Sequence, residues 1–367
     1  MGMIAILAKM QVKGRRRLKS RTIWAIIIAT AFLIGFEAYT LAIVHIEGKA
    51  GLPQNIGNFE QIRNSLKEQE AQEKFSFAVV GDTRSSRTFE RLCDKLRNES
   101  LSFMVILGDF VETCTKGNHD YFKYECMKKY HLPFPVFLIA GNRDVVCKEK
   151  HYDIDKVSLA DFEKMYGPSN FAFEYNGCLF VGLCILPYPF HTEESIKFLD
   201  STLAEYRNEK RKVFVFTHVP PVMSTGPVKN PFKNVEQFID VINRYKVDYV
   251  ISAHYHGYDR TVRKDTVYLV TGGGGAPLDE KKTFGGFYHA AVLTVDNESV
   301  SEKTVLAHNE KSTANDLRHF AISEFAPFLI KHRALAVIGN LLVFSILCVS
   351  LGNLTGKRPY YAGRPAG

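Results

Sequence analysis

The sequence has no long basic stripe, no repeat at a fixed period and no low-complexity tract apart from the four glycines at 272–275. The formal net charge is +8, but much of the basic excess lies near the two ends of the chain, so no nucleic-acid partner is expected. A hydrophobic content of 46% is too ordinary for a disordered or fibrous protein. A chain of 367 residues is long enough for one large α/β domain with accessory segments.

The glycine run at 272–275 is not followed by a helix pattern. It is therefore not a nucleotide-binding loop of the kind that joins a strand to a helix. We expect it to let a turn pass close to the functional site.

Two apolar stretches, 23–46 and 334–352, are long enough to cross a bilayer as helices. Basic residues lie outside both, at 13–21 and in the C-terminal tail, so the positive-inside rule places both termini in the cytoplasm and everything between them on the far side. Lys331 and Arg333, on the near side of the second stretch, slightly weaken the charge difference that supports this orientation.

The first stretch contains Glu37, which is costly at membrane depth, so we expect a tilted span or a polar position that faces a protein neighbour. A cleaved signal peptide is the alternative for this stretch. It is disfavoured because the apolar run is long and no small-x-small cleavage site follows it.

Changes in composition and hydrophobic pattern along the sequence predict seven segments. They are a cytoplasmic basic N-terminus (1–22), a transmembrane helix (23–46), a linker helix (47–74), an α/β domain (75–306), a connector (307–333), a second transmembrane helix (334–352) and a cytoplasmic tail (353–367).

Short apolar runs alternate with amphipathic stretches from residue 75 onward. The runs SFAVVGD, SFMVILGD, PVFLIAGN, VFVFTH and YVISAHYH predict strands buried between helices in a layered α/β fold. The runs FAFEY, CLFVGLCIL, VYLVTGG, HAAVLTV and SVSEKTVL resemble hairpin strands and predict a second sheet packed against the first.

Each of the first five runs ends in a group that can bind metal. These groups are Asp82, Asp109, Asn142, His218 and the pair His254 and His256. Ligands collect at strand ends in open α/β sheets, because loops there bring distant parts of the chain together. Two carboxylates, one amide oxygen and three imidazoles suit Mn, Fe or Zn better than Ca. Two such ions are able to hold a hydroxide and clamp a phosphoryl group.

Five motifs in order along the chain resemble those of the calcineurin-like metallophosphoesterase superfamily, in the branch whose histidine motif is similar to that of purple acid phosphatases. They are GDTR (81–84), GDFVE (108–112), GNRD (141–144), FTHVPP (216–221) and SAHYHGYDR (252–260). The resemblance covers 75–306 and implies a four-layer α/β/β/α sandwich, here flanked by two transmembrane helices. It also implies hydrolysis of a phosphomonoester or phosphodiester by a metal-bound hydroxide at a dinuclear site.

The same resemblance implies two divalent or trivalent metal ions, Mn, Fe or Zn. Asp82 and His256 would bind the first ion, Asp109 would bridge both, and the second would be bound by Asn142, His218 and His254. The candidate catalytic residues are Arg84, Arg143 and Asp144.

Two arginines depart from the family pattern. Arg84 stands where many members have a histidine ligand, and Arg143 stands where they have the histidine that assists the leaving group. Arginine is a poor proton donor but a good electrostatic clamp for phosphate, so Arg143 is expected to stabilise charge. A catalytically weakened phosphate-binding or regulatory pseudoenzyme is therefore the alternative, and a membrane scaffold is a third possibility.

A literal GNHD occurs at 117–120, but no strand separates it from Asp109. We therefore assign Asn142, which follows a predicted strand, as the ligand. His119 remains an alternative source of a proton for the site.

Other features are open to two readings. Tyr258 and Arg260 match the family pattern but are equally consistent with packing and surface charge.

Seven cysteines fit an oxidising compartment. Cys114, Cys126 and Cys147 flank one loop-rich region, where a disulfide of undetermined pairing or buried free thiols are expected. The expected substrate is a phosphoester, and the neighbouring membrane favours one that is lipid-linked or derived from the cell envelope.

Overall fold

The computed structural model describes residues 2–47, 51–70, 72–146, 155–224, 226, 228, 231–279, 285–297 and 299–355. The chain divides into two units. Of the described residues, those within 47–324 form an α/β body, and those within 1–46 and 325–367 form a helical unit.

The first sheet of the body combines strands from both ends of the domain. In spatial order its five described strands are β11 (Val300–Ala307), β10 (Tyr288–Val295), β1 (Phe75–Val80), β2 (Phe103–Ile106) and β3 (Val136–Leu138). Strands β1, β2 and β3 run parallel, whereas β10 is antiparallel to both β1 and β11.

The second sheet is built from the middle of the chain. In spatial order its six described strands are β4 (Phe171–Tyr175), β5 (Cys178–Gly182), β6 (Lys212–Phe216), β7 (Tyr249–Ser252), β9 (Thr266–Thr271) and β8 (Tyr258–Arg263). Its central strands β5, β6, β7 and β9 are parallel.

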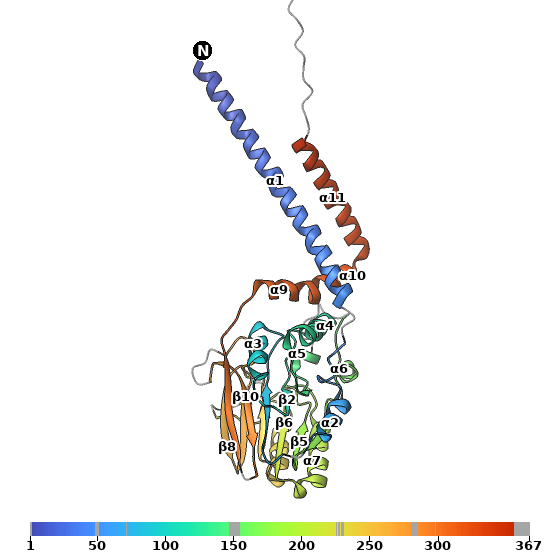
Figure 1. Cartoon of the computed structure of the whole chain (residues 1–367), viewed down its shortest axis with the longest axis vertical. Coiled ribbons are helices and arrows are strands. Elements are labelled where there is room, and N and C mark those ends of the chain that lie inside the picture. The colour runs from blue at the N-terminus through green and yellow to red at the C-terminus, as the bar shows by residue number, and fades with distance from the viewer. Residues whose placement is uncertain are drawn as a thin grey trace, which may run out of the picture. The chain divides into compact units, whose positions relative to one another are not determined.

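Helices surround the two sheets (Figure 1). In the body they are α2 (Phe59–Lys67), α3 (Arg87–Leu96), α4 (Lys116–Glu125), α5 (Asn142–Val145), α6 (Leu159–Tyr166), α7 (Glu193–Tyr206), α8 (Val235–Arg244) and α9 (Thr313–Phe320). A π-helical turn follows α4 (Cys126–Tyr130) and another follows α9 (Ala321–Phe325), while a 3-10 turn follows α7 (Arg207–Glu209).

The layers follow from the alternation of side chains along each strand. In β1, Phe77 and Val79 face the second sheet and pack in an aromatic core with residues such as Phe180 and Phe214. The intervening Ala78 and Val80 face the other way and pack with α3, α4 and α6. A third cluster joins the outer face of the second sheet to α7 and α8. The predicted four-layer α/β/β/α sandwich is therefore confirmed.

The division of strands between the sheets differs from the predicted one. The runs that contain β6 and β7 were expected beside β1 to β3, but they belong to the second sheet, and the β10–β11 hairpin belongs to the first. Strand β8, which contains Tyr258 and Arg260, was not predicted at all. Apolar content shows that a strand is buried, but it does not show which sheet the strand joins.

Two segments outside 75–306 contribute to the body. Helix α2, in the predicted linker 47–74, buries Phe59, Ile62 and Leu66 in the core between the sheets. Helix α9, in the predicted connector 307–333, is bonded to α4, where the Tyr121 hydroxyl donates to Oδ1 of Asn315 at 3.1 Å. The chain on both sides of the predicted domain is thus packed onto it.

The helical unit contains α1 (Gly2–Glu47), α10 (Ala326–Lys331) and α11 (Arg333–Thr355). Its segments Arg21–His45 and Arg333–Leu351 are long and apolar enough to cross a membrane. Oε1 of Glu37 accepts a hydrogen bond of 2.8 Å from the Asn340 side-chain amide, so this acidic residue of α1 faces α11. The expectation that Glu37 has a protein neighbour is confirmed. The tail residues from 356 onward lie outside the described residues.

Candidate metal centre

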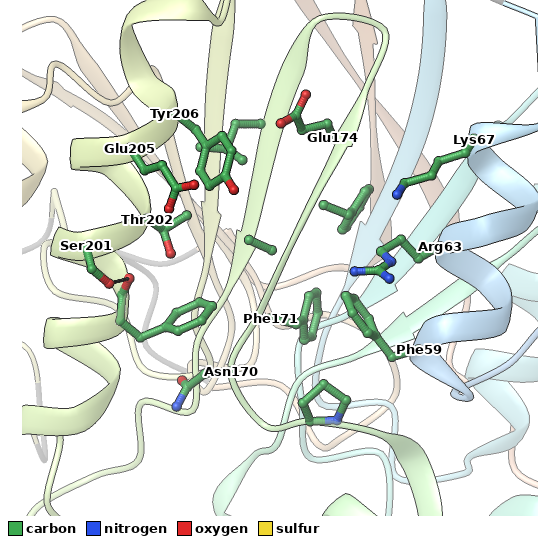
Figure 2. A pocket seen from close by; sticks show the side chains of 15 residues that line it. Phe59, Arg63, Lys67, Asn170, Phe171, Glu174, Ser201, Thr202, Glu205 and Tyr206 are labelled. Carbon is green, nitrogen blue, oxygen red and sulfur yellow. Dashed lines mark hydrogen bonds between the residues drawn. The ribbon is translucent and has the colours of Figure 1, made fainter.

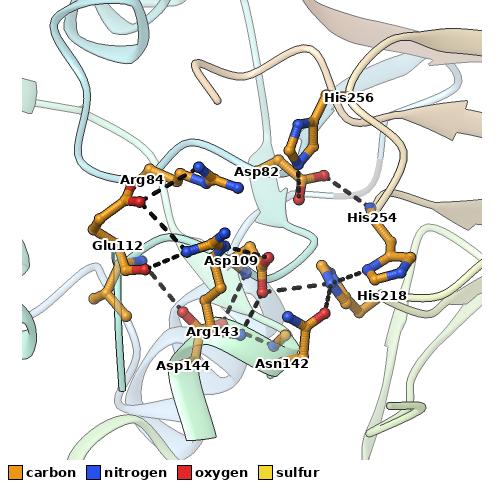
Figure 3. Close-up of polar contacts among 12 residues, drawn as sticks. Asp82, Arg84, Asp109, Glu112, Asn142, Arg143, Asp144, His218, His254 and His256 are labelled. Atoms are coloured by element: carbon orange, nitrogen blue, oxygen red, sulfur yellow. Dashed lines mark hydrogen bonds and ion pairs between the residues drawn. The ribbon is translucent and has the colours of Figure 1, made fainter. Parts of the chain in front are cut away.

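The ends of four parallel strands bring the predicted ligands to one place. Asp82 follows β1, Asp109 follows β2, His218 follows β6 and His254 follows β7. One ligand atom each from Asp82, Asp109 and His218 lie within 4.8 Å of one another, and all three residues are buried. Figure 3 shows Asn142, His254 and His256 around the same cluster. The structure therefore joins the ends of two different sheets into one polar site.

Left-handed backbone turns aim the ligands inward. Asp82, Asp109 and His254 have φ angles of 56°, 52° and 67°. Gly108, immediately before Asp109, has a φ of 90°, and a Cβ there would lie 2.8 Å from Nδ1 of His218. Only glycine fits this turn without strain, because other residues rarely adopt such a conformation.

The glycine run at 272–275 lies against the site. A Cβ on Gly272 would lie 2.7 Å from Oδ2 of Asp82 and 2.0 Å from the carbonyl oxygen of Tyr255. The expectation that this turn passes close to the functional site is confirmed.

The hydrogen bonds of His218 fix which of its nitrogens faces the cluster. Nδ1 lies 2.8 Å from the carbonyl oxygen of Leu107, which only accepts, so Nδ1 carries the proton. In the neutral ring, Nε2 then presents a lone pair. It lies 3.1 Å from Oδ1 of Asn142 and 3.4 Å from Oδ1 of Asp109. Three electron-rich atoms thus point at one another.

His256 is oriented in the same way. Its Nδ1 donates to the carbonyl oxygen of Pro277 at 2.6 Å, which leaves Nε2 facing Oδ1 of Asp82 at 3.5 Å. The other carboxylate oxygen of Asp82 accepts the backbone amide of His254 at 2.8 Å. Oδ1 of Asp82 is buried and accepts no hydrogen bond from the part of the chain that the structure describes.

This donor set fits a metal ion. Buried lone pairs that face one another are unfavourable unless a proton or a cation lies between them. Carboxylate and imidazole donors suit Mn, Fe and Zn. Asp82, Asp109 and His218 therefore form a buried cluster able to hold a metal ion.

Burial and the neighbouring imidazoles together shift the pKa values of Asp82 and Asp109 in opposite directions. Burial raises the pKa of Asp109, with the nearby charge of His218 opposing it. It would also raise the pKa of Asp82, but the imidazoles of His256, His218 and His254 together outweigh burial and bring that pKa below its usual value. The pKa of His256 is raised because Asp82 outweighs the effect of burying the imidazolium.

Asp144 organises the backbone beneath the cluster. One carboxylate oxygen accepts the amides of Gly141 and Asp109, both at 2.8 Å. The other accepts the amides of Phe110 at 3.0 Å and Val111 at 3.3 Å. Burial, followed by the charge of Asp109, raises the pKa of Asp144 well above its usual range. Asp144 thus ties the turn after β2 to the turn after β3.

Arg84 and Arg143 extend toward a residue that the sequence analysis did not select, Glu112. Nη1 of each arginine lies 3.4 Å from Oε1 of Glu112, and Nη1 of Arg143 also donates to the Glu112 carbonyl oxygen at 2.8 Å. Glu112 ends the GDFVE motif, but it does not directly follow a strand. The expectation that functional residues lie at strand ends therefore did not identify it.

The GNHD sequence at 117–120 lies within α4 and is used for packing. Asn118 donates to the hydroxyls of Thr113 and Thr115, and its carbonyl oxygen lies 2.8 Å from Nε2 of His319. Asn142, in contrast, lies beside His218.

His119 is fully buried, and both of its ring nitrogens have partners. The Tyr166 hydroxyl lies 2.8 Å from Nδ1, and Nε2 lies 2.9 Å from the carbonyl oxygen of Asp144. His119 therefore supports the turn that carries Asp144, and neither nitrogen is turned toward the metal ligands.

His119 is expected to make the fold sensitive to acid. Burial lowers its pKa to about 4, below the value of about 6.5 in an unfolded chain. As the pH falls, this histidine is therefore protonated in the unfolded state before it is protonated in the folded state. Its contribution to the free energy of unfolding is fully present above pH ~6.5 and is lost as the pH drops toward ~4, by at most roughly 3 kcal/mol. We expect His119→Gln to flatten the dependence of Tm on pH across this window.

The exposed His191, whose side chain is 82% exposed, provides the matched control for that measurement. His191→Gln should leave the pH dependence of Tm unchanged. Equal acid sensitivity of the parent protein and His119→Gln would contradict the assignment.

Two further expectations concern residues away from the cluster. Arg260 pairs with Glu302 of β11 at 2.9 Å, and Tyr258 packs on Phe287 and His289.

Cys114 is disulfide-bonded and Cys126 is a buried free thiol, while Cys147 lies outside the described residues. The expected disulfide in this region is therefore present.

A cavity of about 790 Å³ lies elsewhere on the body, between α2, β4 and α7 (Figure 2). Phe59, Phe171 and Phe173 form its apolar part, with Arg63 on one side and Glu205 on the other. None of the predicted metal ligands or catalytic residues lines it.

The profile of the calcineurin-like phosphoesterase family matches residues 75–258. This chain belongs to the calcineurin-like phosphoesterase family. The match contains each predicted metal ligand and also Arg84, Arg143 and Asp144. A comparison with curated protein sequences found no match.

Solved structures with a similar fold share little sequence with this calcineurin-like phosphoesterase. GAP50, the anchor in the inner membrane complex of Plasmodium, is 18% identical, with 68% of this chain and 95% of that chain covered and a TM-score of 0.48. A dimetal phosphatase from Danio rerio is 13% identical, with 64% and 98% covered and a TM-score of 0.48. Purple acid phosphatase PPD1 from yellow lupin is 15% identical, with 68% and 55% covered and a TM-score of 0.49.

Proposed function

We propose that this protein is a metal-dependent phosphoesterase that hydrolyses a phosphomonoester or phosphodiester at a dinuclear site. The observation that carries the proposal is the set of buried ligand atoms of Asp82, Asp109 and His218 within 4.8 Å of one another. Among the described residues, Oδ1 of Asp82 accepts no hydrogen bond, and Nε2 of His218 turns a lone pair toward Asp109, as a cation site requires. Bound metal ions supply a nucleophilic water and positive charge for the phosphoryl group.

The residues around the cluster divide into two proposed metal positions. Asp82 and His256 face each other at 3.5 Å and would hold the first ion. His218 and Asn142 lie 3.1 Å apart, and Nδ1 of His254 lies 3.2 Å from Nε2 of His218, so these three would hold the second. Asp109 lies beside His218 and is proposed to bridge the two ions.

The remaining residues are proposed to bind and position. Arg143 donates its backbone amide to Oδ1 of Asp109 at 2.7 Å, which orients that carboxylate. Its guanidinium stays protonated, so it stabilises negative charge on the phosphoryl group and does not act as a proton donor. The Asp144 carboxylate accepts only backbone amides among the hydrogen bonds described above, so we assign it a positioning role and not a catalytic one.

The test is an activity screen on the full chain purified in detergent. Elemental analysis should find bound transition metal, and added Mn should support hydrolysis of p-nitrophenyl phosphate or bis(p-nitrophenyl) phosphate. Lipid-linked phosphoesters in vesicles belong in the same screen, since we propose a substrate at or near the membrane. Metal without turnover on any ester would contradict the proposed activity and leave a phosphate-binding pseudoenzyme.

We also propose that α1 and α11 cross the membrane and that the body lies on the extracytoplasmic side. The basic residues at 13–21 support cytoplasmic termini. The disulfide at Cys114 supports an oxidising compartment for the body, because such bonds rarely persist in the cytosol.

Thiol labelling tests this location. Cys114 in protein denatured directly from cells should resist alkylation until a reductant is added. Cys178, a buried free thiol, should react on denaturation alone and serves as the control. Alkylation of Cys114 without reductant would place the body in a reducing compartment.

A further inference from the structure

Two arginine side chains and one glutamate lie beside the metal ligands. The backbone amide of Arg84 donates to the Asp109 carbonyl oxygen at 3.1 Å, and that of Arg143 donates to Oδ1 of Asp109 at 2.7 Å. Both arginines are thus fixed to the same ligand, and their guanidinium groups point toward Glu112 in Figure 3. These backbone hydrogen bonds fix where each arginine side chain begins, next to Asp109.

The contact that Glu112 makes with the two guanidinium groups is weak. Both N–O distances are 3.4 Å, longer than the ~2.8 Å of a strong charge-assisted hydrogen bond. The Glu112 side chain is 42% exposed, so water competes for its carboxylate. Its backbone carbonyl still holds Nη1 of Arg143 at 2.8 Å, so Arg143 keeps its place if the carboxylate leaves.

Arg84 has unused hydrogen-bonding capacity at this point. Its side chain is only 12% exposed, and its Nε is buried without a hydrogen-bond partner among the described residues. A buried guanidinium with an unpaired donor is unfavourable until an oxygen reaches it. The Arg84 guanidinium can therefore donate to a further oxygen atom, in addition to its long contact with Glu112.

The charges favour a dianion. With the Glu112 carboxylate turned out to water, the two guanidinium groups place two positive charges beside the cluster, and Nε of Arg143 also lies 3.7 Å from Oδ2 of Asp109. A phosphomonoester carries three terminal oxygens and up to two negative charges, whereas a diester carries two terminal oxygens and one charge. The monoester thus has one more oxygen and one more charge to offer to the planar fork of an arginine.

We propose that Arg84 and Arg143 form a subsite for a terminal oxygen of a phosphomonoester dianion, and that the Glu112 carboxylate occupies this subsite until the phosphate arrives. This inference rests on the proposed phosphoesterase function and narrows it to monoesters. Glu112 turns outward to water when the substrate binds, and the two arginines exchange its oxygen for one from phosphate.

Binding of inorganic phosphate to the full-length, Mn-loaded protein tests the subsite, with dimethyl phosphate as the diester probe. By calorimetry, we expect Glu112→Gln to lower the Kd for inorganic phosphate about 3-fold, because a competing exposed carboxylate has been removed. We expect Arg84→Gln to raise that Kd at least about 10-fold, since a hydrogen bond to a charged group is lost. Arg84→Lys should fall between the parent and Arg84→Gln, and the Kd for dimethyl phosphate should change less than about 2-fold in all variants.

Glu310→Gln is the matched control. Glu310 also places one carboxylate oxygen between two arginines, at 2.8 Å from Arg91 and 3.4 Å from Arg87, with 39% side-chain exposure. It should leave phosphate binding unchanged. Metal content and Tm confirm that each variant is folded.

The outcomes separate this inference from the proposed activity, because calorimetry requires no turnover. If Glu112→Gln binds phosphate no more tightly than the parent, or Arg84→Gln weakens both probes equally, the monoester subsite is overturned even in an active enzyme. If the shifts occur as expected in a protein that hydrolyses no ester, the subsite stands and the hydrolase proposal fails.

Discussion

Replacing Asp109 with asparagine is expected to remove both bound metal and phosphoesterase activity. The substitution keeps the size of the side chain, and an asparagine oxygen can still accept the amide of Arg143, which the parent holds at 2.7 Å. What is lost is the negative charge between the two proposed metal positions. Because even partners of metal ligands contribute about 10- to 100-fold to affinity or activity, we expect losses above about 100-fold for this bridge. Elemental analysis and hydrolysis of p-nitrophenyl phosphate measure the two effects.

Asp120→Asn is the control for this experiment. Asp120 belongs to the GNHD sequence in α4, is 42% exposed and pairs with Lys123 at 3.2 Å. Metal content and activity should match the parent protein. The metal assignment fails if Asp109→Asn retains full metal content, or if Asp120→Asn loses it.

Replacing Asp144 with asparagine is expected to weaken the fold and the metal site together. The parent carboxylate accepts four backbone amides, and asparagine would turn an NH₂ group toward some of them. Leaving buried amides without an acceptor costs about 1–3 kcal/mol each, so we expect a loss of roughly 3 kcal/mol in the free energy of unfolding. The displaced turns after β2 and β3 should lower metal affinity about 10- to 100-fold.

Thermal unfolding with and without Mn, together with metal titration, measures this effect. Asp161→Asn is the comparison, because Asp161 accepts a backbone amide of Ser158 at 3.2 Å on the surface of α6. Its Tm should fall far less than that of Asp144→Asn. Equal decreases in Tm for the two variants would contradict the positioning role proposed for Asp144.

Much of the fold and of the candidate site could be predicted from the sequence, because ligands collect where the strands of an α/β sheet end. Asp82, Asp109, His218 and His254 each follow a short apolar run, and parallel strands carry such residues to the same edge. The runs themselves indicated two sheets and the layered fold. Asn142 was separated from the competing Asn118 because only Asn142 follows a strand.

Contacts between distant segments were not visible in the same way. Glu112 meets Arg84 and Arg143 only because the turns after β1, β2 and β3 converge. The Asp144 carboxylate was selected by its motif, but its four amide partners depend on backbone geometry that no residue pattern encodes. The assignment of β6 and β10 to sheets depended on pairing between strands far apart in the chain, which composition does not specify.

In the proposed topology, in which α1 and α11 both cross the membrane, the order of the segments determines how the body is retained there. Helix α1 precedes the body and α11 follows it, and the hydrogen bond between Glu37 and Asn340 fastens these two helices to each other. A single proteolytic cut in either connecting segment would leave the body tethered through the other. Shedding of a soluble fragment therefore requires two cleavages, one on each side of the domain.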